Sequence, residues 1–489
     1  MSMEINIGLA DVIRISPMIA IFIASLLPIT TKVLSGNKEP NNLVTLIQGI
    51  AGLIIGLVLL TVVGGSGELA FSKSLVFDSV TLWMGSLAIL SATGAIIMMY
   101  ENYATNGRQF AELIFLALNS VVGMLILVSA MDLLTLFVGL ELMSLALYLM
   151  IGMSHEEKYS KEAAFKYFLL GSFASAIFLY GTAFVFGTTG STNLITFMQE
   201  ASSLVQSNRL FLFGISFVIL GFCFKVSIAP FHAWTPDVYQ GAPTPHTAFM
   251  ATAVKVVSFA AFLRVIATKS LVGSEGLFDV LQWLAVITMI VGNVGAIVQT
   301  NLKRVLAYSS ISNSGYILIG VITAGVSDAG FFGASSVIFY LFSYCLMTLG
   351  SFAIVSILEK SENHMVTLDN LKGLASRRPV YAFCFSLFLL SLAGMPPSIG
   401  FFGKFYLFNA AVGEGLIWLA VWGVINTVIS VYYYLKPIVY MYMSDGDAEI
   451  AGHNLNATTV TMIVSAVFIT VLGVMSGPIF SAVEKSFIN

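Results

Sequence analysis

Long apolar runs follow one another along almost the whole chain of 489 residues. A bilayer core of about 30 Å needs roughly 20 apolar residues in helical form, and about 14 runs have that length. They lie near residues 16–34, 43–64, 75–100, 109–130, 131–153, 162–188, 209–229, 244–266, 277–298, 304–323, 329–357, 381–409, 415–442 and 457–480. A β-barrel would instead show alternating segments of about ten residues. The pattern therefore predicts an all-α integral membrane protein with about 14 transmembrane helices.

The composition supports a chain whose main solvent is lipid. It is 58% hydrophobic and 10% charged, and its mean hydropathy is +0.93. An ordinary soluble domain is about a quarter charged. The largest polar segment, near 358–380, is too short to fold alone, so one membrane domain is expected over residues 1–489. The net charge of −3 gives no reason to expect nucleic acid as a partner.

Basic residues between the runs predict an orientation in the membrane. Loops that follow odd-numbered runs hold 12 Lys and Arg, and the other side holds 6. Since cytoplasmic loops carry the excess of Lys and Arg, the odd loops are predicted to be cytoplasmic and both termini to lie on the other side. The first run lacks the basic start of a secretory signal, so it is expected to be retained as a span.

Glu141 and Lys255 are ionisable residues placed deep within apolar runs. Such a residue in mid-membrane costs several kcal/mol, so it indicates function by default. The alternative for Glu141 is a neutral carboxyl that bonds a neighbouring helix, and for a lysine a side chain that reaches water at a helix end. The central positions of both residues favour proton or ion transfer.

Two further lysines lie beside prolines that interrupt their runs. Lys225 precedes Pro230 by five residues, and Lys404 follows Pro396 and Pro397 in a glycine-rich stretch. Proline removes a helix hydrogen bond, and broken membrane helices line polar cavities or pack against protein. The two breaks lie about five runs apart. If the chain contains a repeated unit with this odd number of spans, the second copy would enter the membrane from the opposite side. The pattern predicts two inverted five-helix repeats with two broken helices.

Lys166 and His232 are each open to two interpretations. Glu162 lies four residues before Lys166, which is an ordinary helical ion-pair spacing, so a structural pair and a functional lysine are equally supported. His232 follows Pro230 closely, and a proton-relay role competes with a structural one. Four acidic residues at the edges of runs are expected to cap helices or lie in loops: Asp78, Glu112, Asp132 and Asp237.

The stretch PFHAWTPDVYQGAPTP at 230–245 resembles the signature of the antiporter-like subunits of respiratory complex I. The resemblance extends from about the fourth run to the thirteenth, through GLELMSLALYL, KEAAFKYFLLGSFASA and NLKRVLAYSSIS. The stretch GMPPSIGFFGKFYLF at 394–408 favours the subunit N branch of that family. The resemblance implies three N-terminal spans in 1–108, a first repeat in 109–266, a second in 277–442 and a C-terminal span at 457–480.

The resemblance also assigns expected roles to individual residues. Glu141 would pair with Lys225 in a first half-channel, Lys255 would lie at the centre of a hydrophilic axis, and Lys404 would end the relay in a second half-channel. Lys166 would be an accessory lysine near the Glu–Lys pair.

The resemblance can also be followed at His232 and Asn313. His232 falls on a matching histidine, but Asn313 stands where many relatives have a histidine. Because asparagine does not titrate, the step from Lys255 to Lys404 is predicted to use water, with Ser310, Ser312 or Asn313 as fixed hydrogen-bonding partners.

The resemblance implies a function within a larger assembly. NADH oxidation on FMN, electron transfer through iron–sulfur clusters and quinone reduction would take place in partner subunits, and no cofactor or metal is expected in this chain. The implied partners are a neighbouring antiporter-like subunit, small membrane subunits and, indirectly, the peripheral arm. The chain would translocate protons across a bacterial inner membrane. The alternative is a subunit of a multisubunit Na⁺/H⁺ antiporter, which shares the Glu–Lys–Lys pattern.

Overall fold

A computed structural model describes residues 8–36, 40–104, 109–153, 158–266, 275–326, 331–359, 365–446 and 457–488. The elements are, in chain order, α1 (Leu9–Arg14), α2 (Ser16–Leu34), α3 (Asn42–Val63), β1 (Glu68–Ala70), β2 (Leu75–Phe77), α4 (Ser79–Ala104), α5 (Phe110–Ser129), α6 (Leu133–Gly152), α7 (Lys158–Thr189), α8 (Leu194–Ser207), α9 (Arg209–Lys225), α10 (Trp234–Gly241), α11 (Thr244–Phe249), the π-helical turn η1 (Met250–Val254), α12 (Lys255–Ile266), α14 (Glu275–Ile297), α15 (Leu302–Val326), α16 (Phe331–Leu358), the 3₁₀ turn η2 (Leu368–Leu371), α17 (Leu374–Arg377), α18 (Pro379–Ala393), α19 (Ile399–Gly413), α20 (Ile417–Met443), α21 (Ala457–Val474) and α22 (Ser476–Ile488).

Twelve helices in the described ranges are long and apolar enough to cross a bilayer. They correspond to every predicted run except the seventh and the twelfth. In the seventh, α9 ends at Lys225 and α10 begins only at Trp234. In the twelfth, α18 ends at Ala393 and α19 begins at Ile399. The predicted all-α membrane class is confirmed, while the count of 14 spans stays a prediction.

Prolines account for both interruptions. Pro230 lies in the turn between α9 and α10, and Pro396 and Pro397 lie between α18 and α19. A proline cannot donate a backbone hydrogen bond, and its ring clashes with the preceding helical turn. Gly394 ends α18 in a left-handed conformation, with φ of 84°, which a glycine adopts without strain.

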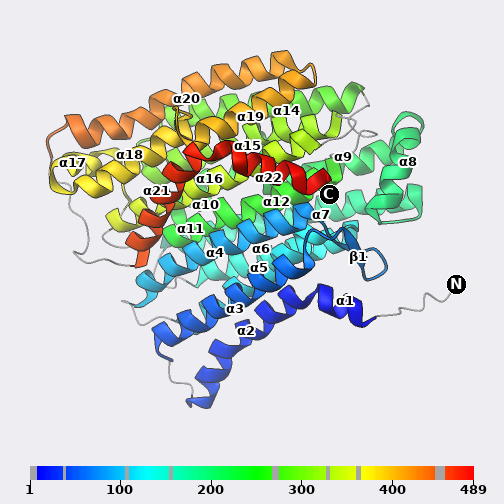
Figure 1. Cartoon of the computed structure of the whole chain (residues 1–489), viewed down its shortest axis with the longest axis horizontal. Coiled ribbons are helices and arrows are strands. Elements are labelled where there is room, and N and C mark those ends of the chain that lie inside the picture. The colour runs from blue at the N-terminus through cyan, green and yellow to red at the C-terminus, as the bar shows by residue number, and fades with distance from the viewer. Residues whose placement is uncertain are drawn as a thin grey trace. The chain divides into compact units, whose positions relative to one another are not determined.

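The chain divides into two compact units, each made of several segments. The first comprises Met1–Met150, Phe168–Lys225 and Ala253–Leu271. Within it α2, α3 and α5 lie side by side (Figure 1), and α12 packs against α4, α5 and α9. Glycines permit close helix crossings, as is common in membranes. A Cβ added at Gly123 of α5 would lie only 2.5 Å from the backbone nitrogen of Met143 in α6.

A short hairpin precedes α4 and corrects the predicted start of the third run. Strands β1 and β2 pair antiparallel, with Glu68 opposite Phe77. The run was expected to be helical from residue 75, but the helix begins at Ser79. Asp78 explains this boundary, because its Oδ1 accepts a hydrogen bond of 2.9 Å from the backbone nitrogen of Thr81. That contact satisfies a free N–H group at the start of the helix, as Asp commonly does.

The second unit comprises Ile151–Tyr167, Val226–Thr252 and Val272–Asn489. Within it α15 packs against α14, α16, α19 and α20, and α16 also contacts α18, α19, α21 and α22. Figure 1 shows α18, α19 and α20 as consecutive yellow-to-orange helices, which precede the red helices α21 and α22 in the chain. The short helix α10 packs against α15, and α11 packs against α16. Helices α15 and α16 therefore lie at the centre of this unit, and the side chains of α15 are almost all buried.

Candidate functional site

Lys225 lies at the end of α9 and is bound by a serine of α6. Its side chain is buried, and Nζ donates a hydrogen bond of 2.8 Å to Ser144 Oγ. The Ser144 hydroxyl donates its own proton to the carbonyl of Leu140 at 2.5 Å. A hydroxyl has one donor and two acceptor positions, so the serine presents a lone pair to the ammonium group. A lysine at a helix C-terminus also interacts favourably with the helix dipole.

Glu141 is one helical turn before Ser144 on α6. Its carboxylate accepts a hydrogen bond from the Ser175 hydroxyl of α7, and its charge acts electrostatically on Lys225. A cavity of about 10 Å³ lies between these helices, lined by Ser144, Tyr148, Ser175 and Lys225 together with apolar residues. That volume is close to the minimum for one water molecule. Lys225 and Ser175, the serine that binds Glu141, thus border the same small cavity, while a direct ion pair between Glu141 and Lys225 stays a prediction.

Lys255 is the first residue of α12, directly after the π-helical turn η1. Its side chain is 4% exposed. A π-helical turn inserts a wider loop of backbone into a helix and is frequent at functional sites. Lys255 therefore directly follows an irregularity in its helix.

Lys404 of α19 reaches back to the broken end of α18. Its Nζ donates to the carbonyl oxygens of Leu392 at 3.0 Å and Ala393 at 3.3 Å. These are among the last carbonyls of α18, which have no partner inside their own helix. Nζ also lies 4.8 Å from the ring centroid of Tyr316, a favourable cation–π distance. The break thus supplies the acceptors that hold a buried lysine.

Lys166 belongs to a separate charged cluster in the second unit. It forms the predicted pair with Glu162 at 2.8 Å and a further pair with Asp237 at 2.9 Å. Asp237, in the first turn of α10, also binds Arg304 at 2.8 Å. Glu162, Lys166 and Asp237 border a cavity of about 190 Å³ that Tyr159 and Met365 also line. Lys166 is 40% exposed in this arrangement, unlike the deeply buried lysines described above.

His232 lies in the turn between α9 and α10, as its place beside Pro230 predicted. The side chain is half-buried and hydrogen-bonds the backbone of Pro230. A relay role for His232 stays a prediction.

Asn313 is held from two sides inside the second unit. The hydroxyl of Tyr340 donates to Asn313 Oδ1, and Asn313 Nδ2 donates to the backbone carbonyl of Ser309 at 2.8 Å. Ser309 Oγ lies 2.5 Å from the hydroxyl of Tyr434. Asn313 is therefore held in a fixed orientation, and its expected role in the step from Lys255 to Lys404 stays a prediction.

The two neighbouring serines also have buried partners. Ser310 Oγ accepts from the hydroxyl of Tyr344 at 2.9 Å, and Ser312 Oγ donates to Asn293 Oδ1 at 2.9 Å. The tyrosines and Asn293 were missed by the sequence analysis. Tyr340 and Tyr344 are four residues apart and therefore share one face of α16, a spacing that could have revealed them.

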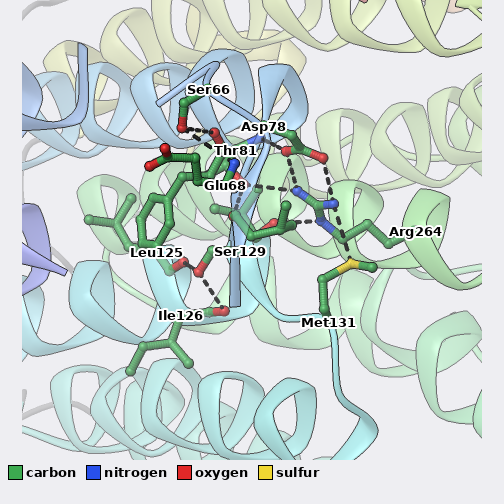
Figure 2. Close-up of polar contacts among 12 residues, drawn as sticks. Ser66, Glu68, Asp78, Thr81, Leu125, Ile126, Ser129, Met131 and Arg264 are labelled. Carbon is green, nitrogen blue, oxygen red and sulfur yellow. Dashed lines mark hydrogen bonds and ion pairs between the residues drawn. The ribbon is translucent and has the colours of Figure 1, made fainter. Parts of the chain in front are cut away.

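Arg264 and Asp78 form an ion pair at the far end of α12 from Lys255 (Figure 2). The guanidinium binds both carboxylate oxygens, at 2.8 and 2.6 Å, and donates to the carbonyl of Val128 at 2.7 Å. Burial alone would raise the pKa of Asp78, but Arg264 and the hydrogen bonds from Thr81 outweigh it and leave the pKa below its usual value. The pair fixes α12 to α4 and α5.

Of the other two edge residues, Asp132 has the capping role that was expected, whereas Glu112 lies in the first turn of α5 and forms an ion pair. Asp132 caps α6, since its Oδ1 accepts from the backbone nitrogen of Leu134 at 2.9 Å. Glu112 pairs with Lys32 at 2.5 Å. In the described part of the chain, no group of three His, Cys, Asp or Glu residues could hold a metal ion.

Comparison with known proteins identifies the family. The sequence model for "NADH:quinone oxidoreductase/Mrp antiporter, TM" matches residues 130–430. The NADH-quinone oxidoreductase subunit N of Bdellovibrio bacteriovorus is 69% identical over 99% of this chain and 100% of that protein. The chain belongs to the subunit N family of NADH-quinone oxidoreductases. The subunit N of Trichlorobacter lovleyi is 40% identical over 88% of each chain.

Solved structures agree with membership of the subunit N family. A chain of respiratory complex I from Thermus thermophilus with bound aureothin superposes with a TM-score of 0.80 at 30% identity, over 96% of this chain and 99% of that one. A chain of the Mrp complex from Dietzia sp. gives a TM-score of 0.82 at 19% identity, over 99% and 98%. The latter identity is so low that it shows a common fold alone. The resemblance to the subunit N branch is confirmed.

Proposed function

We propose that this chain translocates protons across the membrane as a subunit of an NADH-quinone oxidoreductase, through a relay of Glu141, Lys225, Lys255 and Lys404. The observation that carries the proposal is common to the three lysines. Each is at most 6% exposed. Lys225 ends α9, Lys255 directly follows the π-helical turn η1, and Lys404 binds the broken end of α18. Buried lysines in membrane helices are costly and mark ion or proton pathways.

The hydrogen-bond partners of Lys225 and Lys404 bear on how these lysines would change their protonation state. Lys225 is held by Ser144 and lies in the field of Glu141, while Lys404 is held by carbonyls of α18. These are neutral acceptors, which stabilise an ammonium group less than a paired carboxylate does. A small movement of Glu141 relative to Lys225 would therefore change the balance between charged and neutral lysine.

The energies have the right size for such a step. Moving one charge against 100 mV costs about 2.3 kcal/mol. Two unit charges 4 Å apart interact by about 4 kcal/mol at an effective dielectric constant of 20. Separating one ion pair can therefore drive one proton across the membrane. In the proposed cycle, a movement of Glu141 changes the protonation state of Lys225. Lys225 then exchanges a proton with Lys255, and the resulting shift of charge reaches Lys404.

The proposed setting is the membrane arm of complex I. Quinone reduction, with FMN and iron–sulfur clusters, belongs to partner subunits, and the contacts of this chain are with another antiporter-like subunit and small membrane subunits. Protons are taken up from the cytoplasmic side, where the odd loops lie, and both termini face the opposite side. The fourteen spans are completed by the α9–α10 and α18–α19 segments, which occupy corresponding places in two inverted repeats.

The test replaces Lys225 and Lys255 with alanine in the assembled enzyme. We expect both variants to lose proton pumping in sealed vesicles supplied with NADH and quinone. Lys372→Ala is a matched control, because Lys372 lies outside the helices, pairs with the exposed Asp369 and lies 5.7 Å from the ring centroid of Tyr440. Full pumping by the Lys225 and Lys255 variants would refute the relay.

The second candidate is a subunit of a multisubunit Na⁺/H⁺ antiporter. It is favoured by the Mrp-type fold and by the shared family model. The two candidate functions differ in the proteins that should co-purify with this chain. Mass spectrometry of the intact complex extracted in detergent should find flavin and iron–sulfur proteins, and small membrane subunits alone would favour the antiporter.

A further inference from the structure

Lys404 is a buried lysine whose described contacts are all with neutral groups. Its side chain is 4% exposed, and Nζ donates to the carbonyl oxygens of Leu392 and Ala393. The third contact is with the ring of Tyr316 in α15, whose centroid lies 4.8 Å from Nζ. Lys404, Tyr316 and both carbonyl groups belong to the second unit. The described partners of this lysine therefore all lie within one unit.

The two carbonyl groups are available because α18 ends beside the lysine. Carbonyls in the last turn of a helix have no donor in their own helix, and the partial negative charge there favours a cation. The small residue after them leaves room for the lysine, since a Cβ added at Gly394 would lie only 3.2 Å from Lys404 Cδ. Neutral carbonyls bind an ammonium group less strongly than a carboxylate does. The charge of Lys404 is therefore only partly compensated by them.

The position of the Tyr316 ring is set by a second contact with α19. The rings of Tyr316 and Phe408 lie edge to face, with their centroids 6.1 Å apart. Phe408 follows Lys404 by four residues, so the two side chains lie on one face of the helix. Phe408 also packs closely on α20, where a Cβ added at Gly423 would collide with its ring. Phe408 therefore helps to hold the Tyr316 ring in place beside the ammonium group.

We propose that the ring face of Tyr316 is the charge-stabilising partner of Lys404 and acts as a positioning residue for the relay. The face of an aromatic ring is negative, and it attracts a cation most strongly where water is excluded. A buried carboxylate would bind the ammonium group more tightly, whereas the ring stabilises the charge and still lets the lysine release its proton. Tyr316 itself exchanges no proton. The inference rests on the proposed function, because the ring affects pumping only through Lys404.

The experiment separates the charge on the ring face from the volume of the ring. Residue 316 is replaced with phenylalanine, with phenylalanines that carry one, two or three fluorine atoms, and with leucine. Fluorine withdraws electron density from the ring face and changes the volume little. Proton pumping per assembled enzyme is then measured in sealed vesicles. Tyr316→Phe should pump normally, pumping should fall with each added fluorine, and Tyr316→Leu should pump roughly tenfold less or lower still.

Tyr432 provides the matched control for the same series of substitutions. It lies on α20 and is 59% exposed, so fluorination there should leave pumping unchanged. Electron transfer from NADH to quinone in the same vesicles confirms that each complex has assembled.

The possible results separate this inference from the relay itself. Equal pumping by the phenylalanine and trifluorophenylalanine enzymes would overturn the role of the ring face, and so would normal pumping by Tyr316→Leu. Loss of pumping in Tyr316→Phe would overturn it too, because the hydroxyl would then be the active group. Each of these results leaves the relay standing if Lys404→Ala has lost pumping. Normal pumping by Lys404→Ala would overturn both the relay at this lysine and the inference.

Discussion

Lys225 Nζ donates a 2.8 Å hydrogen bond to Ser144 Oγ, three residues beyond Glu141 on the same helix. The serine therefore lies beside the predicted ion pair and binds its cationic member. A neutral acceptor of this kind can hold Lys225 in its charged form while Glu141 is engaged by Ser175. Each member of the predicted pair therefore has a hydroxyl partner in this structure.

Ser144→Ala should impair the first half of the relay. A buried hydrogen bond to a charged group contributes about 1.5–3 kcal/mol, and 1.4 kcal/mol corresponds to a tenfold change in an equilibrium. We expect proton transfer through this chain to slow by roughly tenfold or more, which would bring pumping close to that of Lys225→Ala.

The control for this variant is Ser129→Ala. Ser129 is also buried, but it donates to carbonyls of its own helix, at Leu125 and Ile126. It should pump normally. Equal pumping by the two serine variants and the unmodified enzyme would show that Ser144 has no part in the relay.

Gly171→Ala should close the small cavity beside Lys225. A Cβ at this position would lie 2.0 Å from the Tyr148 hydroxyl, and the rigid phenol ring would have to move within the cavity that it lines. We expect reduced pumping from an assembled complex. Gly187→Ala on the same helix is the control, because nothing lies within 4 Å of its added Cβ. If both variants pump alike, the cavity is not needed.

Much of the fold could be predicted from the sequence because the membrane imposes a length on each helix. The twelve unbroken helices each match an apolar run of about 20 residues. The breaks were predictable because Pro230, Pro396 and Pro397 cannot continue a helix. The start of α4 was wrong by four residues, since Leu75–Phe77 is as apolar as the helix that follows it and only the cap at Asp78 separates them.

Only the charged residues of the candidate site could be predicted from the sequence. Lys225, Lys255 and Lys404 were found because a lysine is out of place in an apolar run. Ser144 and Tyr434 were missed because hydroxyl residues are common in such runs and carry no signal alone. Their contacts join positions 81 and 125 residues apart in the chain, and no spacing in one sequence reveals such distant partners.

Asp78→Asn should destabilise the first unit. Arg264 is only 7% exposed, so loss of the carboxylate leaves a buried charge that the remaining neutral acceptors compensate poorly, at a cost of about 3 kcal/mol. Thermal unfolding of the detergent-solubilised complex should show this loss at pH 7. Asp369→Asn is the control, because Asp369 is 73% exposed in its pair with Lys372 and such pairs contribute little.

The pH dependence of this stabilisation has a defined sign. The pKa of Asp78 is lower in the folded chain than its usual value, so the folded state favours the ionised carboxylate. The contribution is therefore complete above the unfolded pKa of about 4 and is lost as the pH falls through the lower folded value. Stability differences between the enzyme and Asp78→Asn should be constant from pH 7 to about pH 5 and shrink below about pH 4. A difference that shrinks already between pH 7 and 6 would contradict the assignment.

Lys166→Met should leave most pumping intact. Lys166 pairs with both Glu162 and Asp237 at the edge of a large cavity and is 40% exposed. Two carboxylates hold its charge, whereas the contacts described for Lys404 are with neutral groups. Partly exposed ion pairs contribute at most about 1 kcal/mol, so we expect less than about a fivefold change in proton transfer. Lys225→Met in parallel gives the scale of a full loss. If the two variants are equally inactive, Lys166 is a member of the relay and its paired state in this structure is one stage of the cycle.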